Sequence, residues 1–226
     1  MRDYIIYTRS LENFIIDLSS FLIILIVFLF FYSTKYIDKR KLVFFSFYSS
    51  TPFFFNDILF SSTSMWDQYT YTYHLIDLKN IFGTYNYSNY YIENFKPHLK
   101  KIYLGSHIYG IFFFFNEYSI NTIAFINKLV LSLTSIYLLK KKYIKTSHLF
   151  FLLLFPSTII YSSLSLKEIM LAVSSCWIII FLYEKKYLLS ILTFAIFFFL
   201  RPQFYTYIGV FLIYFLILNN LINKKR

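Results

Sequence analysis

The chain has 226 residues, of which 58% are hydrophobic and 24% aromatic, with a formal net charge of +11 and a single cysteine. Soluble domains are about 45–50% apolar with glycine included, so the composition excludes an ordinary soluble protein, and the lone Cys176 excludes a disulfide framework. Several apolar runs approach the roughly 20 residues that cross a bilayer, which indicates a polytopic membrane protein.

These runs predict an all-α fold, a bundle of about seven transmembrane helices that forms one integral membrane domain over residues 1–226. The expected spans are 13–32, 42–60, 118–139, 147–163, 168–183, 187–201 and 203–222. Ser46, Ser49, Ser50, Thr51 and Pro52 interrupt the second span. The sixth span is short, at about fifteen residues.

Four short connections are rich in lysine and arginine, namely 33–41, 140–145, 184–186 and 223–226. Basic loops face the cytoplasm, which predicts an outside N-terminus and a cytoplasmic C-terminus. The four connections hold 13 basic and 2 acidic residues and so account for the whole net charge of +11. The charge is therefore a topology signal and an attraction to anionic membrane lipid, and no nucleic-acid partner is expected.

The long segment 61–117 lies on the outer side in this topology. Apolar and aromatic residues recur in it at loosely helical spacing over 69–78. This spacing predicts an amphipathic helix that lies in the membrane interface. The histidines of the segment are too widely spaced to predict a metal site.

Charged residues from three separate parts of the chain are expected at the outer surface. Asp67 follows the second span, Lys167 and Glu168 form the turn between the fourth and fifth spans, and Arg201 ends the sixth. Arginine and lysine suit a phosphate group. A carboxylate beside a phosphate can act as a general base or hold a divalent cation.

Plainer interpretations of the same residues stay open. Lys167 and Arg201 can be anchors that extend toward the headgroups, and Asp67 can cap a helix. Asp57 is a second candidate carboxylate that could equally cap a helix or line a site. Lys128 lies in mid-span, where an ionisable residue is a functional-site hypothesis by default, or it extends to the interface or pairs with a neighbouring helix.

Three motifs follow one another along the chain: WDQYTYTYHLIDL at 66–78, FPSTIIYSSLSLKE at 155–168 and LRPQF at 200–204. Together they resemble GT-C glycosyltransferases, which take sugars from polyprenyl-phosphate carriers on the outer face of the bacterial membrane, and related capsule or O-antigen membrane proteins. The first resembles the acidic residue, tyrosine and amphipathic helix of the first outer loop in those enzymes. The second resembles their proline-serine break and Lys/Arg-acid pair, and the third their Arg-Pro. The similarity covers roughly residues 55–205.

The resemblance implies roles for the charged residues. Arg201 and Lys167 would hold the lipid-linked phosphate, and Glu168 would orient Lys167. Asp67 would deprotonate the acceptor hydroxyl, or position the acceptor or a divalent cation.

The resemblance also implies substrate contacts, a location and partners. Tyr69 and Trp66 would offer flat faces to a sugar ring or to the isoprenoid. The protein would lie in the bacterial inner membrane and bind a polyprenyl-phosphate-linked sugar. Because the chain is shorter than full enzymes of this class, a partner membrane subunit is one expectation.

Other functions stay open beside the glycosyltransferase. A polymerase or ligase of lipid-linked glycans would share the outer site and the carrier lipid. A non-catalytic subunit of a membrane complex would need no convergence of Asp67, Lys167 and Arg201. A transporter is disfavoured, because the sequence has neither repeated halves nor paired broken spans.

Overall fold

The computed structural model describes residues 11–55, 108–110, 112, 119, 121–198 and 201–223. Every regular element within these ranges is a helix, so the all-α prediction is confirmed for them. The chain divides into two compact units, Met1–Met170 and Leu171–Arg226, and each is described by itself. The single membrane domain that the sequence predicts stays a prediction.

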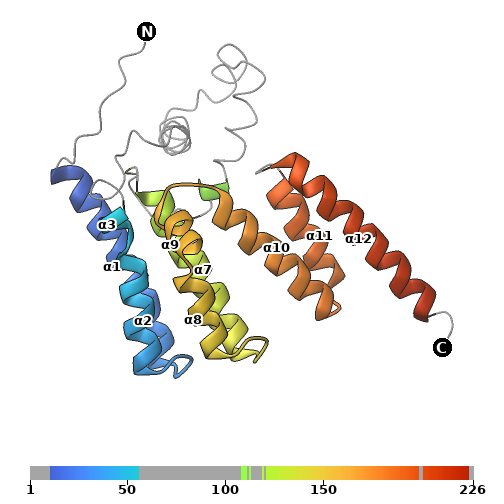
Figure 1. The fold of residues 1–226 in the computed structure, drawn as a ribbon, viewed down its shortest axis with the longest axis horizontal. Coiled ribbons are helices and arrows are strands. Elements are labelled where there is room, and N and C mark those ends of the chain that lie inside the picture. The colour runs from blue at the N-terminus through green and yellow to red at the C-terminus, as the bar shows by residue number, and fades with distance from the viewer. Residues whose placement is uncertain are drawn as a thin grey trace, which may run out of the picture. The chain divides into compact units, whose positions relative to one another are not determined.

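The helices are shown in Figure 1. In chain order they are α1 (Leu11–Ser33), α2 (Lys39–Ser50), α3 (Pro52–Phe55), α7 (Thr122–Lys140), α8 (Thr146–Leu154), α9 (Pro156–Ser163), α10 (Glu168–Tyr183), α11 (Tyr187–Phe197) and α12 (Pro202–Asn223).

Two of the described helices are long and apolar enough to cross a membrane. They are Phe14–Ser33 of α1, with a mean hydropathy of 2.8, and Thr122–Lys140 of α7, with 1.6. The bent pair α8–α9 makes a third if it is one span, while α10, α11 and residues 203–213 of α12 are shorter apolar helices. These helices indicate a membrane protein.

The first unit is built around α7. Helices α1, α2 and α9 all contact α7. Side chains 121–129 are all buried, and 72% of the apolar window of α7 is buried against 22% for α1. A helix that is buried on all sides forms the core of a bundle, whereas α1 leaves most of its apolar surface for lipid.

The second expected span, 42–60, is interrupted within the stretch of hydroxyl residues and proline that predicted a break. Helix α2 ends at Ser50, and Pro52 begins the short helix α3. The hydroxyls of Ser50 and Thr51 donate to the carbonyls of Phe47 at 2.8 Å and Tyr48 at 2.9 Å. Proline fits the first turn of a new helix but not the interior of an existing one. Residues 56–60 lie outside the described part.

The fourth expected span, 147–163, consists of two helices that meet at a bend of 64°. Phe155 has φ −59° and ψ 131°, and Pro156 is the first residue of α9. A residue before proline is driven out of the helical region by the proline ring. The break thus follows from Pro156, and it directs α9 away from the axis of α8.

The second unit packs α10, α11 and α12 together through hydroxyls and rings. Ser190 of α11 donates to the Ile178 carbonyl of α10 at 3.3 Å, and the Ser174 hydroxyl of α10 bonds that of Tyr205 of α12. The rings of Tyr205 and Phe194 meet edge to face at 5.8 Å. Helix α11 is shorter than the expected span 187–201.

Candidate functional site

The predicted site residues fall into three groups. Trp66, Asp67, Tyr69 and Asp57 lie outside the described residues. Lys128, Lys167 and Glu168 belong to the first unit, and Arg201 belongs to the second, where it is exposed just before α12. The convergence of Asp67, Lys167 and Arg201 therefore stays a prediction.

The SLSLKE turn, residues 163–168, is packed into the first unit. Residues 162–166 are all buried, and Lys167 and Glu168 are half-buried. A turn that only ended a membrane span would sit in water, because its free backbone groups need hydrogen-bond partners there. These backbone groups instead find partners inside the protein.

Asn127 of α7 supplies the main contact to this turn. Its side-chain amide donates to the Leu166 carbonyl at 2.7 Å and to the Leu164 carbonyl at 3.4 Å. The hydroxyl of Tyr109 reaches both the Leu166 carbonyl at 3.3 Å and the Asn127 side-chain oxygen at 3.4 Å. Because buried carbonyls need donors, Asn127 and Tyr109 fix the turn against α7.

Two further hydroxyls hold the turn. The backbone N–H of Ala124 in α7 donates to the Ser165 hydroxyl at 3.3 Å. The hydroxyls of Ser163 and Thr51, the latter between α2 and α3, lie 2.7 Å apart. Helix α7 and the α2–α3 junction thus both position the residues that precede Lys167.

Lys128, the next residue along α7, is fully buried. Its ammonium donates to the Ser162 hydroxyl at 2.7 Å and lies 3.6 Å from the centroid of the Tyr48 ring. The Tyr48 hydroxyl is 2.8 Å from that of Ser162, whose own proton goes to the Ile159 carbonyl. Ser162 therefore accepts from both Lys128 and Tyr48.

These contacts rule out the alternative that Lys128 extends to the membrane interface. The ammonium does not extend to a helix end, and no described carboxylate lies within ion-pair distance of it. It contacts α2 and α9 through an aromatic face and a hydroxyl. A buried charge of this kind marks a candidate functional residue.

Three buried side-chain oxygens have no hydrogen-bond partner among the described residues: Ser49 Oγ, Ser132 Oγ and Glu168 Oε2. Ser49 follows Tyr48 in α2, and Ser132 lies one turn after Lys128 in α7. Unpaired buried polar atoms are uncommon in folded proteins. These three leave unpaired polar atoms on α2, on α7 and at the start of α10.

Asp17 of α1 is absent from the sequence predictions. It is 6% exposed, and it accepts hydrogen bonds from the Asn121 side chain at 2.7 Å and from the Ser119 hydroxyl. The signal that could have found it is an acidic residue inside the first apolar run, since such residues are rare and need partners in a membrane. Asn127 carries a similar signal, a polar residue in mid-span.

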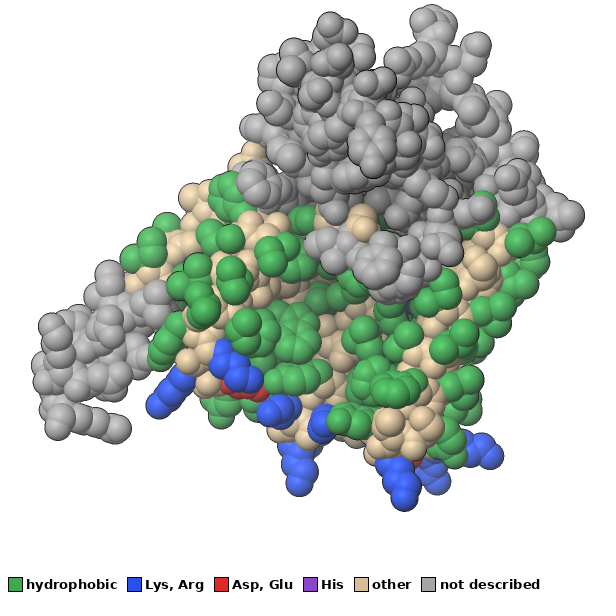
Figure 2. Space-filling model, turned by 180° about the vertical axis from the view of Figure 1, so that it is seen from behind, with side chains coloured by type: hydrophobic (Ala, Val, Ile, Leu, Met, Phe, Trp, Pro, Cys, Tyr) green, Lys and Arg blue, Asp and Glu red, His purple; other side chains and the backbone are tan. Residues whose placement is uncertain are grey.

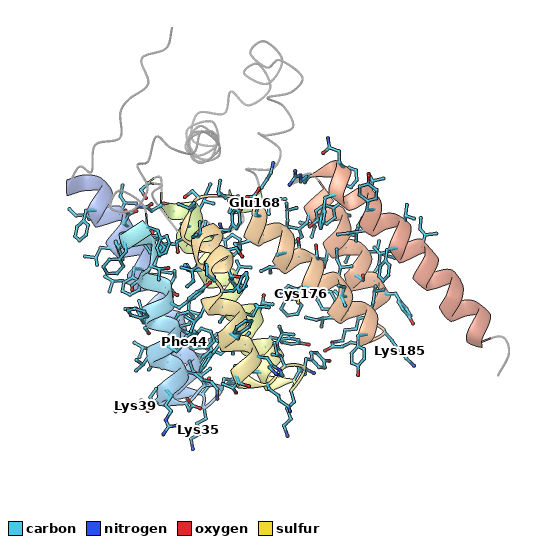
Figure 3. All side chains as sticks on the ribbon, in the orientation of Figure 1. Lys35, Lys39, Phe44, Glu168, Cys176 and Lys185 are labelled. Atoms are coloured by element: carbon cyan, nitrogen blue, oxygen red, sulfur yellow. The ribbon has the colours of Figure 1, made fainter. Side chains whose placement is uncertain are left out.

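The SLSLKE turn and the basic connection that follows α1 lie at opposite ends of the first unit. Figure 3 labels Lys35 and Lys39 at one end and Glu168 at the other. The described residues contain no group of three His, Cys, Asp or Glu that could hold a metal ion. What this geometry offers is a lysine on a turn held at one end of a helical bundle, with a carboxylate next to it in the chain. The lysine is the group that suits an anionic ligand.

No protein-family model matches the chain, and comparisons with curated proteins and with solved structures find no match.

Proposed function

We propose that the chain is a membrane glycosyltransferase, which moves a sugar from a polyprenyl-phosphate carrier to an acceptor at the outer face of the bacterial inner membrane. The observation that carries the proposal is the anchoring of the SLSLKE turn by Asn127. This anchoring is what a binding site needs and a span terminator does not. The resemblance of the 155–168 motif to GT-C glycosyltransferases supports the same function.

The physical reason lies in preorganisation. A charged group that binds a phosphate is most effective when neighbouring hydrogen bonds already hold its backbone in place. Lys167 directly follows Leu166, whose carbonyl receives the 2.7 Å bond from Asn127. Glu168 begins α10 beside it and can orient its ammonium. The pair would meet the carrier phosphate at the headgroup level.

The proposal includes a membrane topology of seven spans with the N-terminus outside. The basic connections of the first unit would face the cytoplasm by the positive-inside rule. The SLSLKE turn lies at the opposite end of that unit, which would face outward.

The remaining roles follow the resemblance. Arg201 would share the phosphate with Lys167, and Asp67 would act as the base or position the acceptor or a divalent cation. Trp66 and Tyr69 would contact the sugar or isoprenoid, and Asp57 would be a second carboxylate.

The test is the binding of undecaprenyl phosphate to the purified full chain in lipid nanodiscs. Losing a hydrogen bond to a charged group costs about 1.5–3 kcal/mol, so Lys167→Gln and Arg201→Gln should each weaken binding by about ten- to a hundredfold. Arg40→Gln, at the basic end, is the matched control and should bind as wild type does. Uncharged undecaprenol should not distinguish these proteins.

A second step separates binding from chemistry. Asp67→Asn should bind undecaprenyl phosphate normally and fail to transfer sugar from a lipid-linked donor. If wild type does not bind the phosphate, or if all variants bind it equally, the glycosyltransferase proposal is wrong and the non-catalytic subunit takes its place. If wild type makes long glycan chains, the protein is a polymerase.

A further inference from the structure

Three basic turns of the chain share one backbone geometry. Lys35 follows α1, Lys142 follows α7 and Lys185 follows α10, and their φ angles are 59°, 58° and 58°. They are the non-glycine residues with positive φ among the described residues. In each turn the next helix begins within a few residues.

Hydrogen bonds identify the same helix ending in all three turns. In the first, the N–H of Lys35 donates to the Tyr32 carbonyl at 3.0 Å, and that of Tyr36 donates to the Phe31 carbonyl at 2.9 Å. This pair of bonds defines the Schellman motif. The Tyr36 and Phe31 rings meet edge to face at 5.7 Å, which is the apolar contact that accompanies the motif.

The other two turns repeat this pattern. The N–H groups of Lys142 and Tyr143 donate to carbonyls of Leu139 and Leu138, both at 3.0 Å. Those of Lys185 and Lys186 donate to carbonyls of Leu182 at 3.0 Å and Phe181 at 2.7 Å.

Lysine is an unfavourable residue at this position. A left-handed conformation costs a residue with a Cβ roughly 1–2 kcal/mol, and glycine is the usual choice there. Lysine occupies the position in three turns out of three. Backbone strain that recurs at matching places points to a use for the side chain, and here the use lies in the charge and reach of lysine.

The first of these turns borders a groove of about 650 Å³. Its lining includes Tyr32, Lys35, Tyr36, Lys39 and Lys41. The volume lies within the roughly 300–1,000 Å³ of small-molecule sites. With the described residues Lys35 and Lys39 form no ion pair, so their charge is available to a ligand.

The one acid in the lining, Asp38, is already engaged. Its carboxylate accepts from the backbone N–H of Lys41 at 2.9 Å and pairs with the Lys41 ammonium at 2.7 Å. It caps α2 in this way. Asp38 therefore does little to offset the positive charge of Lys35 and Lys39.

The second basic turn adds charge to the same groove. The Lys140 ammonium lies 3.7 Å from the centroid of the Tyr36 ring, which brings the α7 end to the wall of the groove. Hydrogen bonding and the charge of Lys140 lower the pKa of Tyr36 below its usual value of 10.0. Together, segments 34–41 and 140–145 carry eight basic residues and one acid, so their surroundings are strongly positive.

We propose that the groove between Tyr32 and Lys41 binds the headgroup of an anionic phospholipid, with Lys35 and Lys39 on its phosphate and Lys140 and Lys142 adding to the positive field. This lipid site is independent of the glycosyltransferase proposal, since the groove lies at the end of the first unit opposite the SLSLKE turn (Figure 3). Lys35 and Lys142 occupy the left-handed position just after α1 and α7, where their ammonium groups would lie near the headgroup layer.

A membrane lipid fits better than a soluble phosphate. The groove begins at the last turn of α1, which is apolar enough to cross a membrane. Headgroups are therefore concentrated at its mouth. Tyr32 and Tyr36 are the amphipathic residues that favour this depth. Figure 2 shows Lys and Arg side chains projecting beyond the hydrophobic side chains at one edge of this view.

The experiment exploits the helix ending itself, because glycine suits the left-handed position and removes the lysine side chain together with its charge. The double variant Lys35→Gly with Lys142→Gly should keep or raise the melting temperature of the full chain. Each basic residue near an anionic surface contributes about 1 kcal/mol, so the variant should bind phosphatidylglycerol about 25-fold more weakly in native mass spectrometry. Phosphatidylcholine binding should not change.

The matched control is Lys35→Arg with Lys142→Arg, which keeps charge and backbone and should bind phosphatidylglycerol as wild type does. Undiminished phosphatidylglycerol binding by the glycine variant would overturn the proposal. So would an equal loss of phosphatidylcholine, a lowered melting temperature, or displacement of the lipid by inorganic phosphate at matched concentration. Undecaprenyl-phosphate binding at the other end should be unaffected in every variant.

Discussion

Replacing Asn127 with alanine tests whether tertiary contacts position the SLSLKE turn. The change removes the 2.7 Å and 3.4 Å bonds to the Leu166 and Leu164 carbonyls, and the 3.4 Å bond from Tyr109. Each carbonyl keeps one partner, since the Tyr109 hydroxyl still reaches Leu166 and the Leu166 N–H still donates to Leu164 at 2.8 Å. The loss in the free energy of unfolding therefore stays below the loss expected if the two carbonyls had no partner left.

The magnitude follows from these distances. Side-chain hydrogen bonds between membrane helices average about 0.6 kcal/mol and reach about 1.7. One strong and two weak bonds give an expected loss of about 1–2 kcal/mol in the free energy of unfolding. A turn that is less ordered by this amount should bind undecaprenyl phosphate up to about 5–30-fold more weakly, although Asn127 is not expected to touch the ligand.

The assay is reversible unfolding of the full chain in bicelles, followed by the lipid-binding titration. Ser135→Ala is the matched control, because within the described residues the Ser135 hydroxyl bonds only the Leu131 carbonyl of its own helix, at 2.8 Å. It should cost a few tenths of a kcal/mol. If Asn127→Ala destabilises no more than this control, the anchoring of the turn by Asn127 is wrong.

Three further outcomes are expected. Lys128→Met keeps the buried volume and removes a charge that no described carboxylate neutralises, so the free energy of unfolding should lie within about 1 kcal/mol of wild type. Lys128→Ala should cost about 2–5 kcal/mol, because it leaves a cavity. Equal losses for the two variants in unfolding assays would contradict this. Pro156→Ala should let α8 and α9 straighten from their 64° bend. With a rise of 1.5 Å per residue, straightening lengthens the distance between spin labels at the outer ends of the two helices by about 4 Å. An unchanged distance would show that packing, not proline, sets the bend. Hydrogen bonds from Lys41 hold the pKa of Asp38 below its usual 3.8. The small stability that this exposed pair contributes is therefore complete above pH 3.8 and is lost as the pH falls through the lowered pKa. NMR titration should show a higher pKa of Asp38 in Lys41→Gln, and no rise would count against the pairing.

Local patterns predicted the helices and their breaks. The apolar runs located α1, α7, α10 and α12, because burial in lipid or protein demands long apolar segments whatever the neighbours are. Pro156 and the Ser50–Pro52 stretch predicted two interruptions, since proline acts on its own backbone and that of the preceding residue. Helix ends moved by a few residues, and the seven spans stay a prediction.

The candidate site was predictable only in part. Lys167 and Glu168 stand out as charges between two apolar runs, and Lys128 as a charge within one. Their partners were harder to find. Ser162 and Tyr48 have ordinary residue types for a helical membrane protein. Asn127 signals itself only as a polar residue in mid-span, and nothing in the spacing of these residues links them to Lys167 or Lys128.

Composition and charge by themselves determined that this is a helical protein suited to a membrane, with its basic residues gathered in short connections. Those properties sum over single residues and short windows, so a sequence contains them in full. Only the tertiary structure decided that the SLSLKE turn is buried against α7, that Lys128 faces Tyr48 and Ser162, and that Asp17 meets Asn121. These contacts join residues up to 104 positions apart. Which distant side chains meet depends on how whole helices pack, and no local pattern specifies that.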